Sequence, residues 1–391
     1  MRGDLAGRAV WLLALGQTLT YAGVYYAFPA LLPDLQAATG WSVAELAWGP
    51  TLGFLVMAGL TPFTGGWIDR GWGGEMLAYA PVIAALGIAA LAFAPSPLIW
   101  GLIWGVIGLA QACCLYESCF AFLTRRLGEG ARAAITRITL VAGFAGTLAF
   151  PLGHWLGAAL GGQGALLAFA ALVLLGAVPV NLWAVRILRR QERAADHSRP
   201  VESGMLGLAL RRPAFWALAA CFGLVWLNHG ILLTYVLLLF ADRGASPALA
   251  TLAAACIGPA QVLGRLALLL QGARLGNRLA TLVALACVVA AGAALWLAGL
   301  VPLLIFAFAA LQGAGAGLMS ILRPVLVAEI LGLRGFGAIS GAVSVAPILA
   351  SAAAPSAGAI LLAGGGGALV YVSCLMLALA SFAIGLVLLR R

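Results

Sequence analysis

Residues 127–162 read LGEGARAAITRITLVAGFAGTLAFPLGHWLGAALGG, and residues 331–366 read LGLRGFGAISGAVSVAPILASAAAPSAGAILLAGGG. Placed one over the other without a gap, the two stretches share a Leu-Gly start, an Ala-Ile pair, a proline and a Gly-Gly end. At nearly the same spacing, three upstream residues also have counterparts: Trp11, Gly53 and Gly59 match Trp216, Gly258 and Gly264. Because paired proline and tryptophan are informative in a chain so rich in alanine and glycine, the sequence indicates an internal repeat.

Each half of the chain contains six long apolar segments, and a transmembrane helix needs roughly 20 apolar residues. Two similar six-helix halves are typical of transporters that rock one half against the other. We therefore predict an all-α integral membrane protein with twelve transmembrane helices in two pseudo-symmetric six-helix bundles. The bundles are expected at 1–190 and 213–391, joined by a cytoplasmic linker at 191–212. The expected spans are 9–33, 44–66, 75–95, 97–123, 133–159, 164–187, 213–240, 247–271, 279–299, 302–327, 337–361 and 366–389.

The composition indicates that lipid is the main solvent of this chain. It is 64% hydrophobic and 9% charged, whereas a soluble domain carries about 25% charged residues. All 22 basic residues are arginines, and nearly all fall at alternate ends of the spans or just inside them, with Arg243 on the other side. Because basic loops stay cytoplasmic, we expect both termini and the linker in the cytoplasm, with the chain in a bacterial cytoplasmic (inner) membrane.

The same distribution limits what the net charge of +10 can mean. The arginines are divided among many short loops, so a basic surface for nucleic acid is not expected. The short loops also leave no room for a soluble catalytic domain, which argues against an enzyme. The expected partners are the bilayer, a small anionic substrate and protons, with no cofactor and a monomeric chain.

The seven cysteines all fall inside expected spans. An odd number without paired extracellular spacing argues against a disulfide framework. Cys113, Cys114 and Cys119 could together contact a soft metal or metalloid, but no histidine or further cysteine completes a ligand set at readable spacing. We therefore expect no metal site, and the thiols serve as small apolar groups in helix packing.

Glu117 places a carboxylate inside the fourth expected span, where polar groups are costly. At 1.5 Å per residue it lies about 12 Å from the cytoplasmic end of that span. On a helical wheel it falls about 150° from the face formed by Gly101, Gly105 and Gly108. If that face packs on a neighbouring helix, Glu117 faces lipid or a central cavity, where it could contact substrate or carry protons. The alternatives are a fixed salt bridge, for instance to Arg137, or snorkelling towards the headgroups.

Arg265 lies in the eighth expected span, about 13 Å from the cytoplasmic end. Gln261 lies one turn before it and Gly258 two turns before it, which gives one stripe of polar and small residues. A guanidinium at that depth offers five donors and a permanent charge to a carboxylate or another oxyanion. The alternative is a gate or structural ion pair with Glu117.

Arg323 in the tenth expected span is either intramembrane or snorkels at the cytoplasmic end. Glu329 could pair with it only if the helix breaks at Pro324. If Arg265 and Arg323 both face the interior, they outweigh one glutamate there, and a cationic interior selects anions.

Aromatic and amide side chains complete the candidate binding residues. Tyrosine hydroxyls in hydrocarbon need partners and make good donors to a substrate. Each of these side chains could equally form an interhelical hydrogen bond or part of an interfacial belt. The candidates are Tyr21 and Tyr25 in the first span, Tyr116 in the fourth, and Asn228, His229 and Tyr235 in the seventh.

A short motif follows the second expected span, Gly65-Gly66-Trp67-Ile68-Asp69-Arg70. It resembles the Gly-x-x-x-Asp-Arg-x-Gly-Arg motif of the major facilitator superfamily, in the loop where that family carries it. Here Trp72, Gly73 and Gly74 replace the usual glycine and basic residues. With the repeat and the linker, the resemblance covers the whole chain. It implies a central cavity lined mainly by spans 1, 4, 7 and 10, and a gating role for Asp69 and Arg70 as a cytoplasmic latch.

Residues 258–265, Gly-Pro-Ala-Gln-Val-Leu-Gly-Arg, look like the eighth span of the monocarboxylate and oxalate/formate branch of that superfamily. The resemblance implies that Arg265 holds the substrate carboxylate. That branch often has an aspartate where this chain has Gln261, and its animal members have a lysine in the first span, whereas this chain has no lysine. A proton carrier must then lie elsewhere, and Glu117 is the candidate.

The leading hypothesis is a secondary transporter that moves a small organic anion by alternating access, with a monocarboxylate as the first candidate. In this hypothesis transport is proton-coupled or anion-exchanging. Arg265 binds the anionic group and Glu117 couples transport to protons. The rival hypothesis is a proton-driven exporter of drugs and other cations, in which Glu117 faces the substrate and Arg265 locks the gate. A membrane enzyme or receptor is a third hypothesis. The sequence shows no nucleophile–base pair, metal-ligand spacing or soluble domain that would support it.

Overall fold

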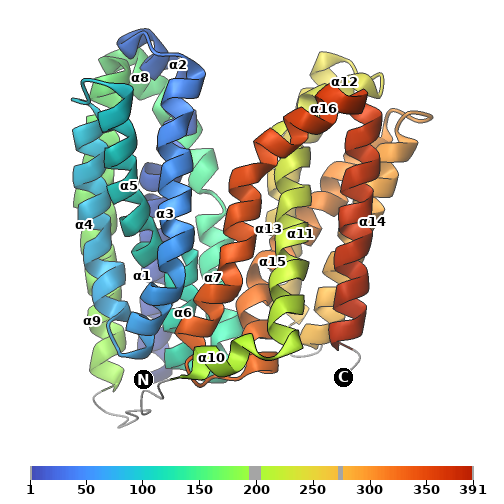
Figure 1. The fold of residues 1–391 in the computed structure, drawn as a ribbon. Helices are drawn as coiled ribbons and strands as arrows, with labels where there is room; N and C mark the ends of the chain where they lie inside the picture. The colour runs from blue at the N-terminus through green and yellow to red at the C-terminus, as the bar shows by residue number, and fades with distance from the viewer. Residues whose placement is uncertain (1, 193–203, 272–275, 390–391) are drawn as a thin grey trace. The chain divides into compact units, whose positions relative to one another are not determined.

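The structure, a computed structural model, describes residues 2–192, 204–271 and 276–389. Within these ranges every regular element is helical (Figure 1), because helices satisfy all backbone hydrogen bonds within one segment of a chain in lipid. The chain divides into two compact units. Unit 1 comprises Met1–Met205 with Arg334–Ala342, and unit 2 comprises Leu206–Leu333 with Val343–Arg391.

Short turns join the helices of unit 1. α3 begins at a capping box, in which the Ser42 hydroxyl accepts from the Glu45 N–H and the Glu45 carboxylate accepts from the Ser42 N–H. Pro97 occupies the first turn of α5, where its missing N–H costs nothing. The elements are α1 (Arg2–Tyr21), η1 (Ala22–Tyr26), α2 (Ala27–Thr39), α3 (Val43–Asp69), α4 (Gly73–Leu91), α5 (Pro97–Cys114), α6 (Tyr116–Leu127), η2 (Gly128–Gly130), α7 (Ala131–Ala142), α8 (Ala145–Ala171), η3 (Leu172–Ala177) and α9 (Val178–Glu192).

Unit 2 takes in the later helices, although the first residues of its last helix belong to unit 1. Of the linker expected at 191–212, residues 193–203 lie outside the described part of the chain, as does Arg274 of the loop before α14. The elements are α10 (Met205–Leu210), α11 (Pro213–Thr234), α12 (Val236–Asp242), α13 (Pro247–Gln271), α14 (Asn277–Leu297), α15 (Leu304–Leu331) and α16 (Phe336–Leu389).

In the part of the chain that the structure describes, nine helical stretches are long and apolar enough to cross a membrane. Two of them, Ala131–Arg189 and Phe336–Leu389, have 59 and 54 residues, far more than the roughly 20 that one crossing needs. Each is interrupted by non-helical glycine backbone, with Gly161 at φ 70° and Gly366 at φ 63°. Glycine adopts these left-handed angles without the steric cost of a Cβ. The repeated stretches quoted above both end at these interruptions.

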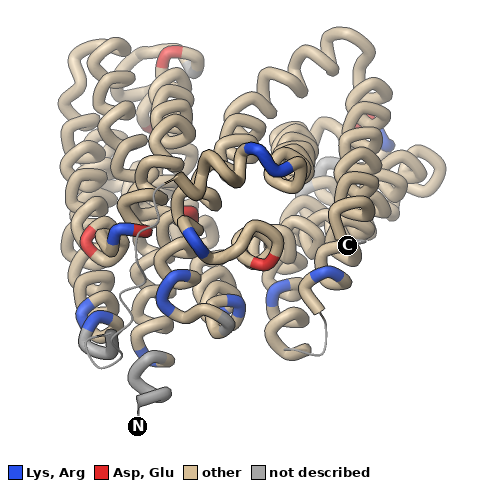
Figure 2. Tube along the Cα trace, turned by 60° about the horizontal axis from the view of Figure 1, so that its bottom comes forward, with Lys and Arg blue, Asp and Glu red and all other residues tan. Residues whose placement is uncertain are grey.

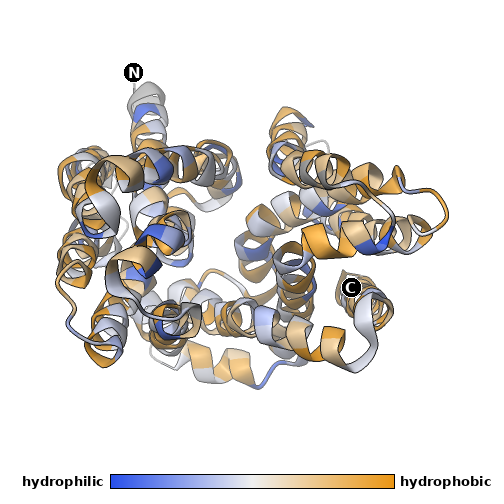
Figure 3. Cartoon of the chain, turned by 90° about the horizontal axis from the view of Figure 1, so that it is seen from above, coloured by the Kyte–Doolittle hydropathy of each residue, from blue (hydrophilic) through white to orange (hydrophobic). Residues whose placement is uncertain are grey.

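Hydrophobic residues predominate along the helices, which are coloured largely orange in Figure 3, and many large apolar side chains are exposed. Phe93 and Leu175 are each 74% exposed, a degree of exposure that suits hydrocarbon rather than water. Charged residues are sparse along the chain (Figure 2). The structure thus agrees with the expectation of an integral membrane protein.

Each unit has its own apolar core. In unit 1 the core includes Trp100, Trp104 and Phe169, and in unit 2 it includes Phe240 and Phe308, whose rings meet edge to face at 5.6 Å. Lipid tails are as apolar as these side chains, so close packing rather than the hydrophobic effect holds such helices together.

Small residues supply that close packing at repeat-related positions. Gly108 of α5 lies against the backbone of Gly53 in α3, so the expected glycine face does pack on a neighbouring helix. In unit 2, Gly313 of α15 lies against the backbone of Ile257 in α13. Any Cβ at either glycine would collide with that backbone, which explains the glycine at each position.

Candidate functional site

The fourth expected span is not one helix. α5 ends at Cys114 and α6 begins at Tyr116, because Leu115 is extended at φ −82° and ψ −170°. The break releases backbone carbonyls that side chains then satisfy. The Gln17 side-chain amide donates to the Cys114 carbonyl at 2.9 Å, and the Ser118 hydroxyl donates to the Ala112 carbonyl at 2.6 Å. A wheel drawn continuously through Leu115 therefore misplaces Glu117, which lies in the first turn of a new helix.

The first helix is also irregular at the same level of unit 1. Between α1 and α2, residues Ala22–Tyr26 form a π-helical segment, a feature that occurs frequently at functional sites. The buried Gln111 of α5 donates to the Val24 carbonyl within this segment, at 3.2 Å. The irregular first helix and the broken fourth span are therefore joined by hydrogen bonds from both sides.

Four predicted site residues meet where these two irregular segments lie. The ring centroids of Tyr21 and Tyr116 are 4.3 Å apart, and those of Tyr21 and Tyr25 are 5.7 Å apart. The Tyr116 backbone N–H donates to the Tyr21 hydroxyl at 3.2 Å. The Glu117 carboxylate interacts electrostatically with the phenols of both Tyr21 and Tyr25. We call Tyr21, Tyr25, Tyr116 and Glu117 the tyrosine–glutamate cluster.

The cluster is partly accessible. Tyr25 is 36% exposed, and Tyr21, Tyr116 and Glu117 are half-buried. Glu117 lies in the first turn of α6, where the helix dipole and the N–H groups of the helix end favour a negative charge. The cluster therefore combines aromatic rings with a carboxylate.

In unit 2, Arg265 is buried, with 6% of its surface exposed. Its Nη2 donates to Gln261 Oε1 at 3.3 Å, one helical turn away, and its Nε donates to the Gly317 carbonyl of α15 at 3.5 Å. Gly317 lies against the backbone of Gln261, so α13 and α15 meet closely at this point. The polar stripe expected from Gln261 and Arg265 is present.

A buried amide network lies in the same unit. Gln312 of α15 donates through Nε2 to Asn228 Oδ1 at 3.0 Å, and the same nitrogen lies 3.3 Å from His229 Nδ1. Asn228 donates onward to the Cys374 carbonyl at 2.8 Å. His229 also interacts electrostatically with Arg265. Asn228 and Gln312, at 0% and 2% exposed, therefore tie α11, α15 and α16 together beside Arg265.

Sequence reasoning missed Gln312. An amide in the middle of an apolar span was itself the signal, because a buried side-chain amide needs partners. Tyr235, by contrast, is one of the predicted binding residues. Its hydroxyl donates to the Pro355 carbonyl at 2.7 Å, at the junction between α11 and α12, which is the interhelical role left open as its alternative.

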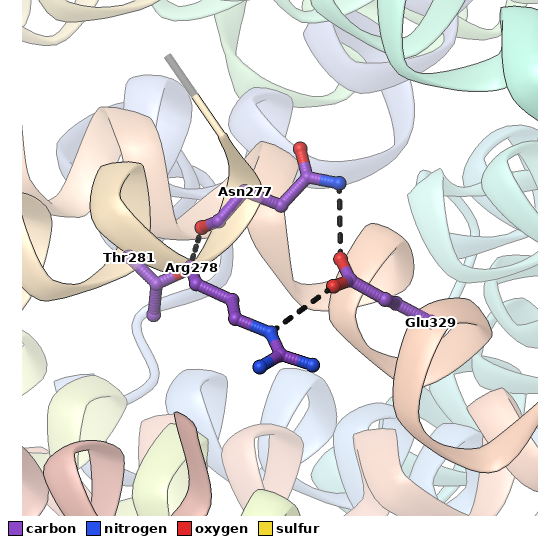
Figure 4. A network of polar contacts seen from close by, with 4 residues as sticks. All are labelled: Asn277, Arg278, Thr281 and Glu329. Carbon is purple, nitrogen blue, oxygen red and sulfur yellow. Dashed lines mark hydrogen bonds and ion pairs between the residues drawn. The ribbon is translucent and has the colours of Figure 1, made fainter. Parts of the chain in front are cut away.

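Arg323 is buried at 7% exposure within α15, so it does not extend to the surface as a snorkelling arginine does. α15 continues unbroken through Pro324 to Leu331. Glu329 instead accepts from Asn277 Nδ2 at 3.1 Å and from Arg278 Nε at 3.4 Å, at the start of α14 (Figure 4). The helix break on which a pairing of Glu329 with Arg323 depended is therefore absent from α15.

Asp69 and Arg70, the two expected latch residues, have different surroundings. Asp69, at the end of α3 and 7% exposed, accepts hydrogen bonds from the backbone N–H groups of Gly337 at 2.8 Å and Ala338 at 3.0 Å. Both N–H groups belong to the first turn of α16, where a negative charge is stabilised. Arg70 is exposed and borders a cavity of about 300 Å³ that Trp67, Trp72 and Met76 also line.

Among the described residues, no group of three histidine, cysteine or acidic side chains is placed to hold a metal ion. Cys113, Cys114 and Cys119 are buried thiols outside any disulfide.

Comparisons with known proteins agree on the fold. The family model described as Major Facilitator Superfamily matches residues 13–301. A bacterial homologue of the iron transporter ferroportin, solved in an outward-facing state, superposes with a TM-score of 0.70 at 18% identity, covering 98% of this chain and 100% of that one. FucP, a Major Facilitator Superfamily transporter in the outward conformation, superposes with a TM-score of 0.69 at 15% identity, covering 97% of each chain. No curated protein matches the chain.

Proposed function

Because this chain belongs to the Major Facilitator Superfamily, and is thus a transporter and not an enzyme, we propose that it carries a small organic anion, a monocarboxylate first of all, by alternating access. The two solved neighbours, a homologue of an iron transporter and FucP, are too distant in sequence to suggest a substrate. The choice of an anion is instead made from the polar residues of unit 2.

One observation carries the choice of an anion, the buried Arg265. A guanidinium stays protonated in proteins, and few charges survive burial in a membrane protein without a functional reason. Gln261 and the Gly317 carbonyl hold the side chain in place. His229, which interacts electrostatically with Arg265, adds a hydrogen-bonding group nearby. Arg323, also buried in unit 2, adds a second positive charge that favours an anion.

Glu117 is the proposed proton carrier, with anion exchange as the other possible coupling. It is a half-buried carboxylate close to the Tyr21 phenol in unit 1. Asp69 is the proposed latch, with Arg70 beside it, because its carboxylate holds the first turn of α16.

We further propose twelve membrane crossings in two pseudo-symmetric bundles, 1–190 and 213–391. The breaks at Gly161 and Gly366 support reading Ala131–Arg189 and Phe336–Leu389 as two crossings each. The run of α1, η1 and α2 supplies one more, which raises the nine stretches to twelve. By the positive-inside rule, both termini lie in the cytoplasm of a bacterium, and the chain works as a monomer in the inner membrane.

One observation favours the rival function, export of organic cations. The tyrosine–glutamate cluster offers aromatic rings and a carboxylate, the two groups that attract cations most strongly in proteins. Under this rival function Glu117 faces the cargo and Arg265 only locks the gate.

A thermal-stability screen of the purified protein separates the two functions. Ligands that bind the folded state raise the melting temperature, by the equivalent of about 2.7 kcal/mol at a hundredfold excess over Kd. We expect carboxylates such as lactate, pyruvate and oxalate to stabilise the protein and cationic dyes to leave it unchanged. Stabilisation by the dyes alone would support the exporter instead.

A further inference from the structure

We propose that the tyrosine–glutamate cluster of unit 1 is a binding site for an alkylammonium group. This inference goes beyond the anion-binding role proposed for Arg265 in unit 2 and does not depend on it. The ammonium site itself stands on unit 1 alone.

The aromatic rings supply the first part of such a site. Tyr21 lies within 6 Å of two other tyrosine rings, at 4.3 Å from Tyr116 and 5.7 Å from Tyr25. Phe54 of α3 adds a ring 5.7 Å from Tyr25, nearly edge-on to it. Aromatic faces attract quaternary and alkylated ammonium ions through the ring quadrupole. Tyr25 is the most exposed residue of the cluster, at 36%.

Glu117 supplies the second part, a carboxylate next to the rings. It interacts with the phenols of Tyr21 and Tyr25, so charge and aromatic faces occupy one place. It lies in the first turn of α6, the end of a helix at which the dipole favours a negative charge. A carboxylate beside aromatic rings is suited to pairing with a cation.

The third part is the backbone that builds the cluster. The break at Leu115 and the π-helical segment at Ala22–Tyr26 both lie next to it, and discontinuous helices mark binding sites in transporters. The Gln17 and Gln111 amides, each buried, bond to carbonyls at these two irregular segments. A regular helix in either place would turn Tyr25, Tyr116 or Glu117 to another direction. The irregular backbone therefore serves to bring these side chains together.

A pair of isosteric ligands tests the site in the full-length purified protein. Trimethylglycine, (CH3)3N⁺CH2COO⁻, and 3,3-dimethylbutanoate, (CH3)3CCH2COO⁻, have nearly the same shape and differ in the positive charge. We expect the wild type to bind trimethylglycine at least about tenfold more tightly, the size of a desolvated cation–π contact. A wild type that binds trimethylglycine no better than its isostere, or binds neither, overturns the proposal without recourse to a variant.

Variants then assign the preference to the cluster. Glu117→Gln and Tyr25→Leu should reduce the preference for trimethylglycine, whereas Tyr25→Phe, which keeps the ring, should retain it. Tyr79→Leu is the matched control, since Tyr79 is an exposed tyrosine of α4 outside the cluster. Melting temperatures without ligand show that each variant is folded. A preference that survives both Glu117→Gln and Tyr25→Leu places the ammonium elsewhere and refutes the assignment.

The same ligands separate this inference from the proposed anion function. Arg265→Ala should leave the preference for trimethylglycine over its isostere unchanged. If Arg265→Ala leaves both affinities unchanged while Glu117→Gln still abolishes the preference, the anion role fails and the ammonium site stands. If instead Arg265→Ala weakens the binding of both ligands while Glu117→Gln leaves the preference intact, the ammonium site fails and the anion role stands.

Discussion

The Asp69 carboxylate accepts a hydrogen bond of 2.8 Å from the backbone N–H of Gly337, a residue 268 positions further along the chain. The bond joins the end of α3 to the first turn of α16, and Asp69 accepts a second one from Ala338. An anion at a helix N-terminus is stabilised by the helix dipole and by N–H groups that lack partners within the helix. Any conformation that moves the start of α16 away from α3 must break both bonds.

The first prediction concerns this latch. Asp69→Asn keeps an acceptor oxygen but removes the charge, which is expected to weaken the contact by about 1 kcal/mol. Transport should slow because the balance between conformations shifts, whereas ligand affinity should stay nearly unchanged. Uptake into vesicles and binding by the detergent-purified protein measure the two quantities separately. Glu45→Gln, which makes the same charge change at the exposed start of α3, is the control. A normal uptake rate in Asp69→Asn removes this residue from the mechanism.

The second prediction concerns Arg265. Arg265→Ala should weaken binding of the anionic substrate by about 2–5 kcal/mol, because a charged hydrogen-bond partner is lost from a buried place. Arg265→Lys, which keeps the charge but loses the planar set of donors, should cost less. Arg211→Ala, at an exposed arginine, should change nothing. Calorimetry measures the affinity of the wild type and the three variants for the anion. An Arg265→Ala protein with wild-type anion affinity contradicts the proposed function.

The third prediction separates the two candidate functions at Glu117. If this residue carries the coupled proton, Glu117→Gln should chiefly remove the dependence of uptake on pH between about pH 5 and 8, since glutamine does not titrate. If the protein exports cations, the same variant should lose recognition of cationic cargo while Arg265→Ala retains it. Initial rates of uptake at a series of pH values provide the measurement. Unaltered pH dependence in Glu117→Gln would show that the proton is carried elsewhere.

The fourth prediction concerns the buried amide network. Gln312→Leu leaves Asn228 Oδ1 without the donor it has at 3.0 Å, and hydrogen bonds between membrane helices average about 0.6 kcal/mol with a maximum near 1.7. We expect a lower melting temperature, corresponding to roughly that range. Gln163→Leu, at an exposed glutamine of α8, should leave the melting temperature unchanged. Equal melting temperatures for the two variants would show that Gln312 does not tie the helices together.

The fifth prediction is architectural. Superposing residues 9–187 on residues 213–389 should relate the two halves by a pseudo-two-fold axis along the membrane normal and bring Pro151 onto Pro355. An experimental structure, or cysteine accessibility mapping of the twelve proposed crossings, provides the test. A different number of crossings, or halves that do not superpose, would remove the basis for the repeat.

Sequence patterns were sufficient for the class of protein and for the family. Apolar segments of membrane length and the motif ending in Asp69-Arg70 led to an integral membrane transporter of the Major Facilitator Superfamily, and the family match confirms that much. The pairing of Gln261 with Arg265 followed from i, i+4 spacing and is present. The resemblance to the monocarboxylate branch has no such confirmation and stays a prediction.

Features that depend on distant partners could not be predicted in the same way. The break at Leu115 depends on hydrogen bonds from Gln17, 97 residues away from Cys114, and from the neighbouring Ser118. The network around Gln312 joins side chains more than 80 residues apart. Helical periodicity carries information over a few turns only. It therefore predicted one continuous fourth span, and it gave no sign of Gln312, whose partners lie on other helices.

The breaks at Gly161 and Gly366 have a practical consequence for anyone who wants to trap this transporter in one state. Each joins two long helices through glycine backbone, without a projecting connecting peptide. Such a junction offers an antibody fragment almost no side chain to recognise and offers a protease no extended segment to cut. Immunisation or display selections should therefore yield binders against the connections that do project, such as the turn around Gly40 between α2 and α3. Epitope tags meant to report topology belong there as well.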